Sequence, residues 1–460
     1  FIIIVAISVL IIYLSLFGIE TDRFNSQIKN KINLIDENIR VELKKIRLTL
    51  NPLNFKVNVK TIGPKIYYKK KNIKLEDIEA QISLISLIKN QIISSKLKFS
   101  TRSIFLRDLI AFARAASNKP ELLILEKSIT NGQVILDVNL NFDDTGSIKD
   151  DYEVKAIIID GKIRLLKNLN FEKINFLLNI KNNTFDFKDI KFIKDNSKFF
   201  SENINVVKDK KQFLIEGNIS NKNTIFNNEL LNFLNIDLQK KGFSNTNFNS
   251  TSKFSFVIDK KFKIKKIVLD SDIHVNKSEY KKPKFFDNYV KFNNNIIELK
   301  NHKIKSNIKD NKLTINGFGK IKIQENFDDV NYSINLSGKD FELNSQLILK
   351  EIKLNSQEYL KYFIKNFDNT TILKDQKIDI NFNKKELQIK GNGKIKFENE
   401  FEEIKFKVSK IKDLFIFDTQ LDFDQTSFKI DFLNYIKKDK SKAQIKVLGK
   451  YETENYLILE

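Results

Sequence analysis

Lys303 to Tyr332 reads KIKSNIKDNKLTINGFGKIKIQENFDDVNY, and from Lys377 to Phe406 the chain reads KIDINFNKKELQIKGNGKIKFENEFEEIKF, at an offset of 74 residues. The two stretches align without a gap, and 11 of the 30 aligned pairs are identical. In both copies, apolar residues alternate with polar ones through a shared L-x-I-x-G-x-G-K-I-K core. A period of two residues is typical of a half-buried β-strand, because successive side chains point to opposite faces. Repetition of such a unit favours an extended β-structure over a compact enzyme.

The glycines of this core share the parity of its apolar residues. Gly317 and Gly319 lie on the same parity as Leu313 and Ile315, where a glycine permits a bend or a close approach of another group to the backbone. The competing interpretation is a hairpin turn at Asn316-Gly317. Both interpretations stay open from the sequence alone.

The charge of the chain comes almost entirely from dispersed lysine. Lys and Arg number 80 against 58 Asp and Glu, which gives a net charge of +22, and only seven of the basic residues are arginine. A nucleic-acid-binding protein would cluster Arg and Lys with exposed aromatic residues in a recognisable module, and neither feature is visible. We therefore predict a solvated lysine face and no nucleic-acid partner; the lesser alternative is weak attraction to anionic lipid surfaces.

The first 19 residues are uncharged and almost wholly apolar: FIIIVAISVLIIYLSLFGI. About 20 such residues span the hydrocarbon core of a bilayer. A cleaved signal peptide would have a shorter apolar core and a small-residue cleavage site, and no such site follows Gly18. We predict a single transmembrane anchor at residues 1–19, truncated at its start because the chain begins with Phe and contains no Met. The C-terminus is expected to be cut as well, because Tyr456–Leu459 stops within a strand-like pattern.

Residues 20–460 are expected to form one continuous β-structure with a few helices. The pattern predicts a short helix over Phe24–Ile32, and then strands from Ile39 with a β-bulge at Lys44-Lys45, where the parity slips. Helical insertions are predicted at 103–117, 229–235 and 356–367.

The number of strands suggests a groove. At about 4.8 Å per strand, roughly 20 to 25 strands would form a sheet about 100–120 Å across, and open sheets of that size curl or split. The predicted fold is therefore mainly β: an elongated, twisted open β-groove of repeated antiparallel strands with a few short helices and an N-terminal transmembrane helix. A long apolar trough of this kind suits acyl chains.

No catalytic constellation is visible. The only histidines, His274 and His302, each lie among polar residues without a second His or a Cys nearby, so neither a metal site nor a His base is predicted. The adjacent acids Asp143-Asp144 and Asp328-Asp329 are interpreted as solvated turn formers. Because the chain has no cysteine, thiol chemistry and disulfides are excluded. We predict no enzyme activity, no cofactor and no metal.

The layout resembles the AsmA-like family of inner-membrane-anchored proteins of Gram-negative bacteria, which includes the TamB-type and YhdP-type members. The apolar start at Phe1–Ile19, the amphipathic segment Phe24–Ile32 and the paired strands Ile39–Val59 around Asn51-Pro52 carry the resemblance. Ile78–Asn90, a strand that runs into a short helical turn, and the repeated L-x-I-x-G units add to it.

This resemblance implies a periplasmic β-groove that is held in the inner membrane by a single pass at residues 1–19. Phospholipids would move along it between the inner and outer membranes and so support outer-membrane integrity; outer-membrane or other envelope proteins are implied as further partners. Two alternatives remain: an assembly factor or structural protein for outer-membrane β-barrel proteins, and an adhesin-like β-solenoid with a dry core.

The residues predicted to line the groove are strand residues of the apolar parity. A dry core and a lipid-filled groove would use the same residues, and the 40 phenylalanines fit either. The predicted lining residues are Leu136, Val138, Leu140, Leu313, Ile315, Ile321, Ile323, Leu387, Ile389, Ile395 and Phe397.

Overall fold

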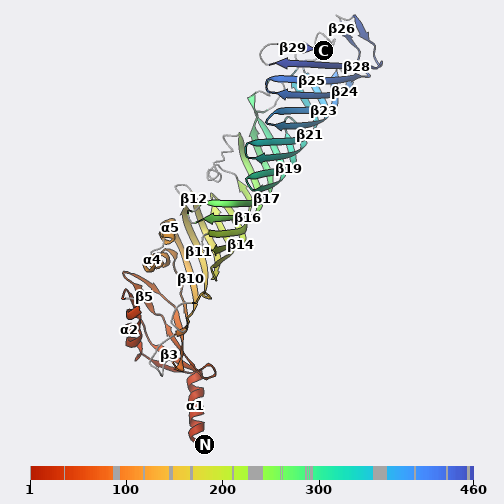
Figure 1. The fold of residues 1–460 in the computed structure, drawn as a ribbon. Coiled ribbons are helices and arrows are strands. Elements are labelled where there is room, and N and C mark those ends of the chain that lie inside the picture. The colour runs from red at the N-terminus through yellow and green to blue at the C-terminus, as the bar shows by residue number, and fades with distance from the viewer. Residues whose placement is uncertain are drawn as a thin grey trace. The chain divides into compact units, whose positions relative to one another are not determined.

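The chain divides into two compact units that consist mainly of strands. The first unit comprises Phe1–Ile219 and Val257–Lys265, and the second comprises Ser220–Phe256 and Lys266–Glu460. Figure 1 shows the first in red to yellow-green and the second mostly in green to blue. The computed structural model describes residues 2–35, 37–85, 94–117, 120–143, 149–165, 169–209, 212–225, 242–259, 261, 263–284, 287, 290, 294–355, 370–397, 400–430, 434–452 and 456–459.

An apolar helix begins the first unit. α1 (Ile2–Leu16) has 15 residues, none of them buried. It covers most of the segment for which we predict a membrane anchor. Within the described residues, no helix is both long enough and apolar enough to cross a membrane.

The main sheet of the first unit is antiparallel throughout. Strand pairings follow the order β1, β3, β4, β7, β8, β10, β11, β12, β13 and β14, and β9 also pairs with β10. β15 follows in the strand order. The bounds are β1 (Ile19–Thr21), β3 (Ile46–Asn51), β4 (Lys56–Ile62), β7 (Asp77–Ser83), β8 (Ser94–Ser100), β9 (Ile104–Phe105), β10 (Ile129–Asn141), β11 (Glu153–Leu165), β12 (Leu169–Lys181), β13 (Thr184–Lys194), β14 (Ser197–Asp209) and β15 (Gln212–Ile225).

The predicted bulge at Lys44-Lys45 is wrong. β2 (Ile39–Glu42) pairs with β5 (Lys65–Tyr68), which pairs with β6 (Lys71–Lys74) in a separate small sheet. β3 begins beyond the two lysines and pairs with β1 and β4. The lysines therefore connect strands of two different sheets, and the parity slips because one strand has ended and another has begun.

The helices of the first unit confirm part of the prediction. α2 (Asn25–Ile35) matches the expected short helix, and α4 (Leu106–Ala116) matches the helix at 103–117 except for the residues that pair as β9. α5 (Pro120–Ser128) was not predicted, because Pro120 was interpreted as a stop signal although proline is also favoured in the first turn of a helix. A 3₁₀ turn, Pro52–Asn54, joins β3 and β4. The helices predicted at 229–235 and 356–367 lie outside the described residues.

The second unit is an open antiparallel sheet. From β17 to β25 each strand pairs with the next one in sequence; β25 pairs with β28, and β28 with β29. β26 and β27 form a separate hairpin. This confirms the predicted mainly β fold with a long open sheet. The bounds are β16 (Phe243–Asp259), β17 (Ile264–Lys281), β18 (Ile296–Lys309), β19 (Lys312–Lys322), β20 (Phe327–Ser337), β21 (Asp340–Asn355), β22 (Thr370–Asn383), β23 (Glu386–Phe397), β24 (Glu400–Ile411), β25 (Leu414–Phe423), β26 (Phe428–Ile430), β27 (Tyr435–Lys437), β28 (Ala443–Glu452) and β29 (Tyr456–Leu459).

Short Asn- and Asp-rich turns produce this up-and-down order. Asp310 and Asn311 join β18 to β19 with φ values of 50° and 61°, and Asn182-Asn183 and Asp195-Asn196 do the same in the first unit. Two consecutive residues with positive φ form a two-residue turn whose twist matches that of the strands, and Asn and Asp tolerate this conformation best among residues with a side chain. The Asn and Asp pairs between the strands therefore form the turns of tight hairpins.

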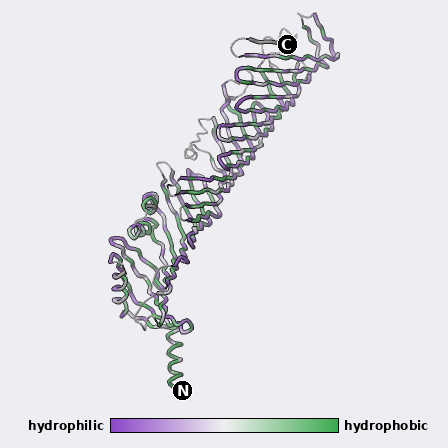
Figure 2. The backbone as a smooth tube through the Cα atoms, viewed as in Figure 1, coloured by the Kyte–Doolittle hydropathy of each residue, from purple (hydrophilic) through white to green (hydrophobic). Residues whose placement is uncertain are grey.

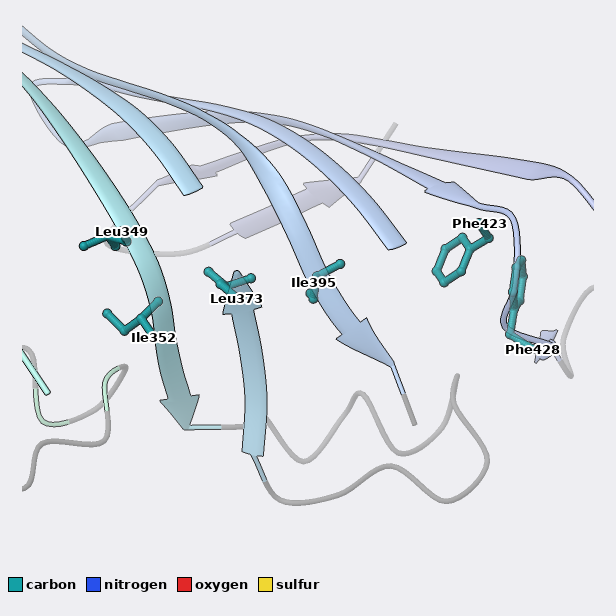
Figure 3. Packing of buried hydrophobic residues seen from close by; sticks show 6 residues of the cluster. All are labelled: Leu349, Ile352, Leu373, Ile395, Phe423 and Phe428. Atoms are coloured by element: carbon teal, nitrogen blue, oxygen red, sulfur yellow. The ribbon is translucent and has the colours of Figure 1, made fainter. Parts of the chain in front are cut away.

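One apolar cluster is buried near the C-terminal end of the second unit (Figure 3). Leu349 and Ile352 of β21 meet Leu373 of β22 and Ile395 of β23, and Phe423 and Phe428 complete the cluster. The two phenylalanine rings lie 4.7 Å apart between centroids. The sheet is therefore tightly packed at this end.

Candidate functional site

The two sequence repeats form equivalent three-stranded modules in the second unit. The first copy takes in parts of β18, β19 and β20, and the second takes in parts of β22, β23 and β24. The register shifts between Lys300 and Lys303 in the first copy and between Lys374 and Lys377 in the second. Each shift marks a β-bulge at the same position of the repeat, so the alignment of the sequences is also an alignment of the structures.

The glycines of the repeat allow aromatic rings to lie against the backbone. A Cβ atom built on Gly317 would lie 2.4 Å from the Tyr332 ring, and one on Gly391 would lie 2.2 Å from the Phe406 ring. Because β19 runs through Gly317 without a turn, the hairpin interpretation is wrong and the close-approach interpretation is confirmed.

A buried polar side chain occupies each bulge. His302 is 4% exposed, and its Nε2 donates to the Lys320 carbonyl at 3.0 Å; Gln376 is fully buried, and its Nε2 donates to the Lys394 carbonyl at 2.9 Å. Burial lowers the pKa of His302, which therefore stays neutral, so that Nδ1 accepts from the Tyr332 hydroxyl at 3.3 Å. Burial raises the pKa of Tyr332 to about 12. These contacts indicate a structural role for His302.

An acidic residue faces inward at the same place in each copy. Asp328 pairs with Ile321 across the ladder, and Glu402 pairs with Ile395. Asp328 accepts one amide, that of Lys350, at 2.8 Å, whereas Glu402 accepts three, from residues 424–426, at 2.5–2.9 Å. Both acids sit in the ladder of strands, so the sequence-based interpretation of Asp328 as a solvated turn former is wrong.

Three of the eight predicted groove residues of the second unit lie in two apolar rows that cross the sheet; we call the face that carries these rows the apolar face. Strand registers place Ile389 in one row and both Ile315 and Leu387 in the row beside it. Paired strand by strand, the first row consists of Ile273, Ile304, Gly317, Tyr332, Ser345, Ile380, Ile389, Val408, Phe417 and Gly449. The second consists of Ser271, Ser306, Ile315, Ile334, Leu343, Phe382 and Leu387.

The other predicted residues of this unit have different surroundings. Ile395 is buried in the apolar cluster at the end of the unit, with Ile323 packed against that cluster. Leu313 lines a small hollow of about 650 Å³ at the hairpin end of β19. Ile321 lies opposite Leu299 and is half-buried. The side chain of Phe397 lies outside the described residues.

The three predicted residues of the first unit share one face of its sheet. Leu136 packs in a cluster that α4 covers through Leu106 and Leu109, and Val138 is buried. Leu140 opens a row that continues through Leu97, Ala80, Val59, Leu48 and Ile19. The structure thus brings Leu136, Val138 and Leu140 together on an apolar sheet face that is partly covered by a helix.

The apolar face of the second unit is half-exposed over most of its area. Along β18, exposed polar residues alternate with the half-buried Ile304, Ser306 and Ile308, and β24 shows the same alternation around Ile404 and Val408. Figure 2 shows the corresponding alternation of hydrophilic and hydrophobic residues along the strands. A dry core between two layers would bury such side chains, so this face keeps apolar area accessible.

A large cavity of the second unit lies on the opposite, polar face. Its volume is about 1530 Å³, and each strand from β17 to β22 contributes the two polar-face residues on either side of the row through Ile304. The residues of that row between them also belong to the lining, except for Ile380: they are Ile273, Ile304, Gly317, Tyr332 and Ser345. None of the eleven predicted groove residues lines it. Sequence reasoning missed it, although the Asn-rich polar parity of these strands was a visible signal.

The described residues offer no metal centre, since no group of three or more His, Cys, Asp or Glu side chains is placed to hold an ion among them. The surface features that remain are the half-exposed apolar face and the polar cavity. In comparisons with known proteins, no protein-family model and no curated protein matches this chain.

Proposed function

We propose that this protein is a non-enzymatic lipid conduit, in which acyl chains of phospholipids lie on the apolar face while their headgroups remain in water. The observation that carries the proposal is the half-exposed apolar face of the second unit. The row through Ile304 and Ile389 continues from β17 to β28 without a charged residue. A flexible apolar chain can therefore follow this row from strand to strand without meeting a charge.

The driving force is the removal of methylene groups from water. Each buried CH₂ contributes about 0.8 kcal/mol, so an acyl chain on the apolar face is held strongly. Because no position along the row carries a charge, a lipid that moves along it meets no charged side chain that an acyl chain would have to cover. No covalent step is required.

The proposal also places the chain at the inner membrane of a Gram-negative bacterium, with the sheet in the periplasm. The apolar, unburied surface of α1 supports attachment to a bilayer: Ile2, Ile3 and Ile4 are each more than two-thirds exposed. The net charge of +22 adds attraction to anionic headgroups.

Photocrosslinking of the purified full chain tests the proposal. We expect a phospholipid with a photoreactive acyl chain to label residues of the apolar face. Replacing Ile315 and Ile389 with Asp should reduce labelling about tenfold, because a charge on the lipid path costs more than 1.4 kcal/mol to cover with an acyl chain. The matched control is Asn316→Asp with Gln388→Asp, on the same strands but the opposite face, which should label like the wild type.

Two outcomes would overturn the proposal. One is a folded protein without labelling; the other is equal labelling of the Ile315→Asp/Ile389→Asp variant and the wild type. In either case, crosslinking to outer-membrane β-barrel precursors would test the assembly role instead. Circular dichroism of both variants establishes that they retain the β-fold.

A further inference from the structure

The polar cavity of the second unit is larger than a typical small-molecule site. Its volume of about 1530 Å³ exceeds the roughly 300–1,000 Å³ of such pockets. Its floor runs from β17 to β23, six strand steps or about 29 Å. It therefore has room for a segment of an extended polymer.

Two cross-strand rows on the polar face form this floor. Their side chains are amides, a hydroxyl, lysines, aspartates and the imidazole of His274, with one exposed phenylalanine ring. The first row is Asp272, Lys305, Asn316, Ser333, Asn344 and Asn381, and the second is His274, Lys303, Phe318, Asn331, Gln346, Asp379 and Lys390. Residues 220–223 and 249–251 extend the lining.

Several of the polar groups are available to a ligand. Within the described part of the chain, the amides of Asn316, Asn331 and Asn381 make no side-chain hydrogen bond to protein, and all three residues are exposed. An amide offers two donors and an acceptor, which match the hydroxyl groups of sugars. Because the three residues stand on adjacent or nearby strands of one sheet, their spacing is fixed before any ligand arrives.

The charged groups favour an anionic ligand. Four lysines line the cavity and only two aspartates do. Asp379 already accepts from Gln346 at 2.7 Å, whereas Lys305 and Lys390 have no ion-pair partner among the described residues. Phe318 is 54% exposed, and the Lys303 ammonium lies 5.8 Å from its ring centroid. The ring supplies an apolar surface against which the C–H face of a sugar can pack.

We propose that this cavity binds an acidic glycan, a chain of linked sugars that carries carboxylate groups. Amides and hydroxyls bind the sugar hydroxyls, Lys305 and Lys390 pair with the carboxylates, and Phe318 supports one ring. A peptide strand is disfavoured, because the cavity lies over the middle of the sheet, where no edge is free for strand addition. Single-stranded nucleic acid is disfavoured, because its binding sites stack successive bases on several aromatic rings.

Calorimetric titration of the purified full chain tests this proposal, with a galacturonic-acid oligomer as the probe and a neutral galactose oligomer of equal length for comparison. We expect saturable binding of the acidic oligomer that weakens as salt rises, and weaker binding of the neutral one. Lys305→Gln with Lys390→Gln, and separately Asn316→Ala with Asn381→Ala, should each weaken binding at least about tenfold, since each variant removes two hydrogen-bonding groups.

The control is Lys191→Gln with Lys198→Gln, which removes the same charge from exposed positions of β13 and β14 in the first unit and should bind like the wild type. Absence of binding, or binding unchanged in the cavity variants, would overturn the proposal. So would tighter binding of a single-stranded oligonucleotide that the same variants abolish. Lipid photocrosslinking of the cavity variants should match that of the wild type, so failure of this proposal and failure of the lipid proposal are distinguishable.

Discussion

The two copies of the repeat have the same backbone but hold it together with different polar residues. The bulge carries His302 in the first copy and Gln376 in the second, and each donates to the carbonyl of the equivalent lysine. The inward acid is Asp328 in the first copy and Glu402 in the second. What the two copies share is therefore a set of hydrogen-bonding requirements, and more than one side chain can satisfy each requirement.

The acids mark the largest difference between the copies. Burial raises the pKa of Asp328, and the single amide bond from Lys350 does not reverse this effect. Burial acts in the same direction on Glu402, but three amide bonds outweigh it, and the pKa of Glu402 is lowered. The longer side chain of Glu402 thus connects β24 by hydrogen bonds to residues 424–426, which follow β25. Asp328 in the first copy accepts only the amide of Lys350.

The first prediction concerns removal of these acids. Glu402→Ala should destabilise its region by about 3 kcal/mol, because it leaves three backbone amides, including that of the buried Thr426, without this acceptor, whereas Asp328→Ala, which removes one such bond, should cost about 1 kcal/mol. Hydrogen exchange of amides around each site measures the local opening free energy, which suits a long repeat array where global unfolding is not two-state. Equal losses in the two variants would show that the number of amide bonds does not determine the difference.

The second prediction concerns the close contact between a glycine and an aromatic ring in each copy of the repeat. Gly391→Ala should destabilise the second copy by about 1–3 kcal/mol, because its Cβ would overlap the Phe406 ring. Gly317→Ala should act similarly on the first copy through Tyr332. The matched test is Gly391→Ala combined with Phe406→Ala: removal of the ring should make the glycine substitution nearly neutral, giving a coupling energy of at least about 1 kcal/mol by the same exchange measurement.

Features that depend on residues close together in the sequence could be predicted, whereas features that depend on the pairing of distant strands could not. The strand parity and the open antiparallel sheet are local or repeat with the period of the strand, so the alternating pattern predicts them. The same pattern leaves two interpretations of the glycines open, a close approach or a hairpin turn, and the strand register is needed to decide between them. The bulge positions were not predicted, because His302 and Gln376 differ in chemistry and show their equivalence only once the register is known. The Asn-rich polar parity of the strands is visible in the sequence, but the polar cavity also depends on which of these residues become cross-strand neighbours, and that follows only from the register.

The third prediction is that local stability depends on pH in opposite directions around Asp328 and Glu402. A carboxyl with a raised folded-state pKa contributes stability that is complete below its unfolded pKa and is lost as pH rises through the folded value, and a lowered pKa gives the opposite slope. Around Asp328, local stability should therefore fall as pH rises above about 3.8, the ordinary value; around Glu402 it should fall as pH drops below about 4.5. Asp328→Asn and Glu402→Gln should each flatten the slope of their own region only, as measured by hydrogen exchange across this range.

The smallest effect is expected from exchanging the bulge residues themselves. His302→Gln gives the first copy the side chain of the second, and a Gln amide can donate to the Lys320 carbonyl as Gln376 does to that of Lys394. The loss is the 3.3 Å contact with the Tyr332 hydroxyl, so we expect a change below about 1 kcal/mol. His302→Leu is the matched control: it keeps the bulk but leaves the Lys320 carbonyl without this donor and should cost about 1–3 kcal/mol. If His302→Gln were as destabilising as His302→Leu, the bulge would require the imidazole ring itself, and the two copies would not be interchangeable at this position.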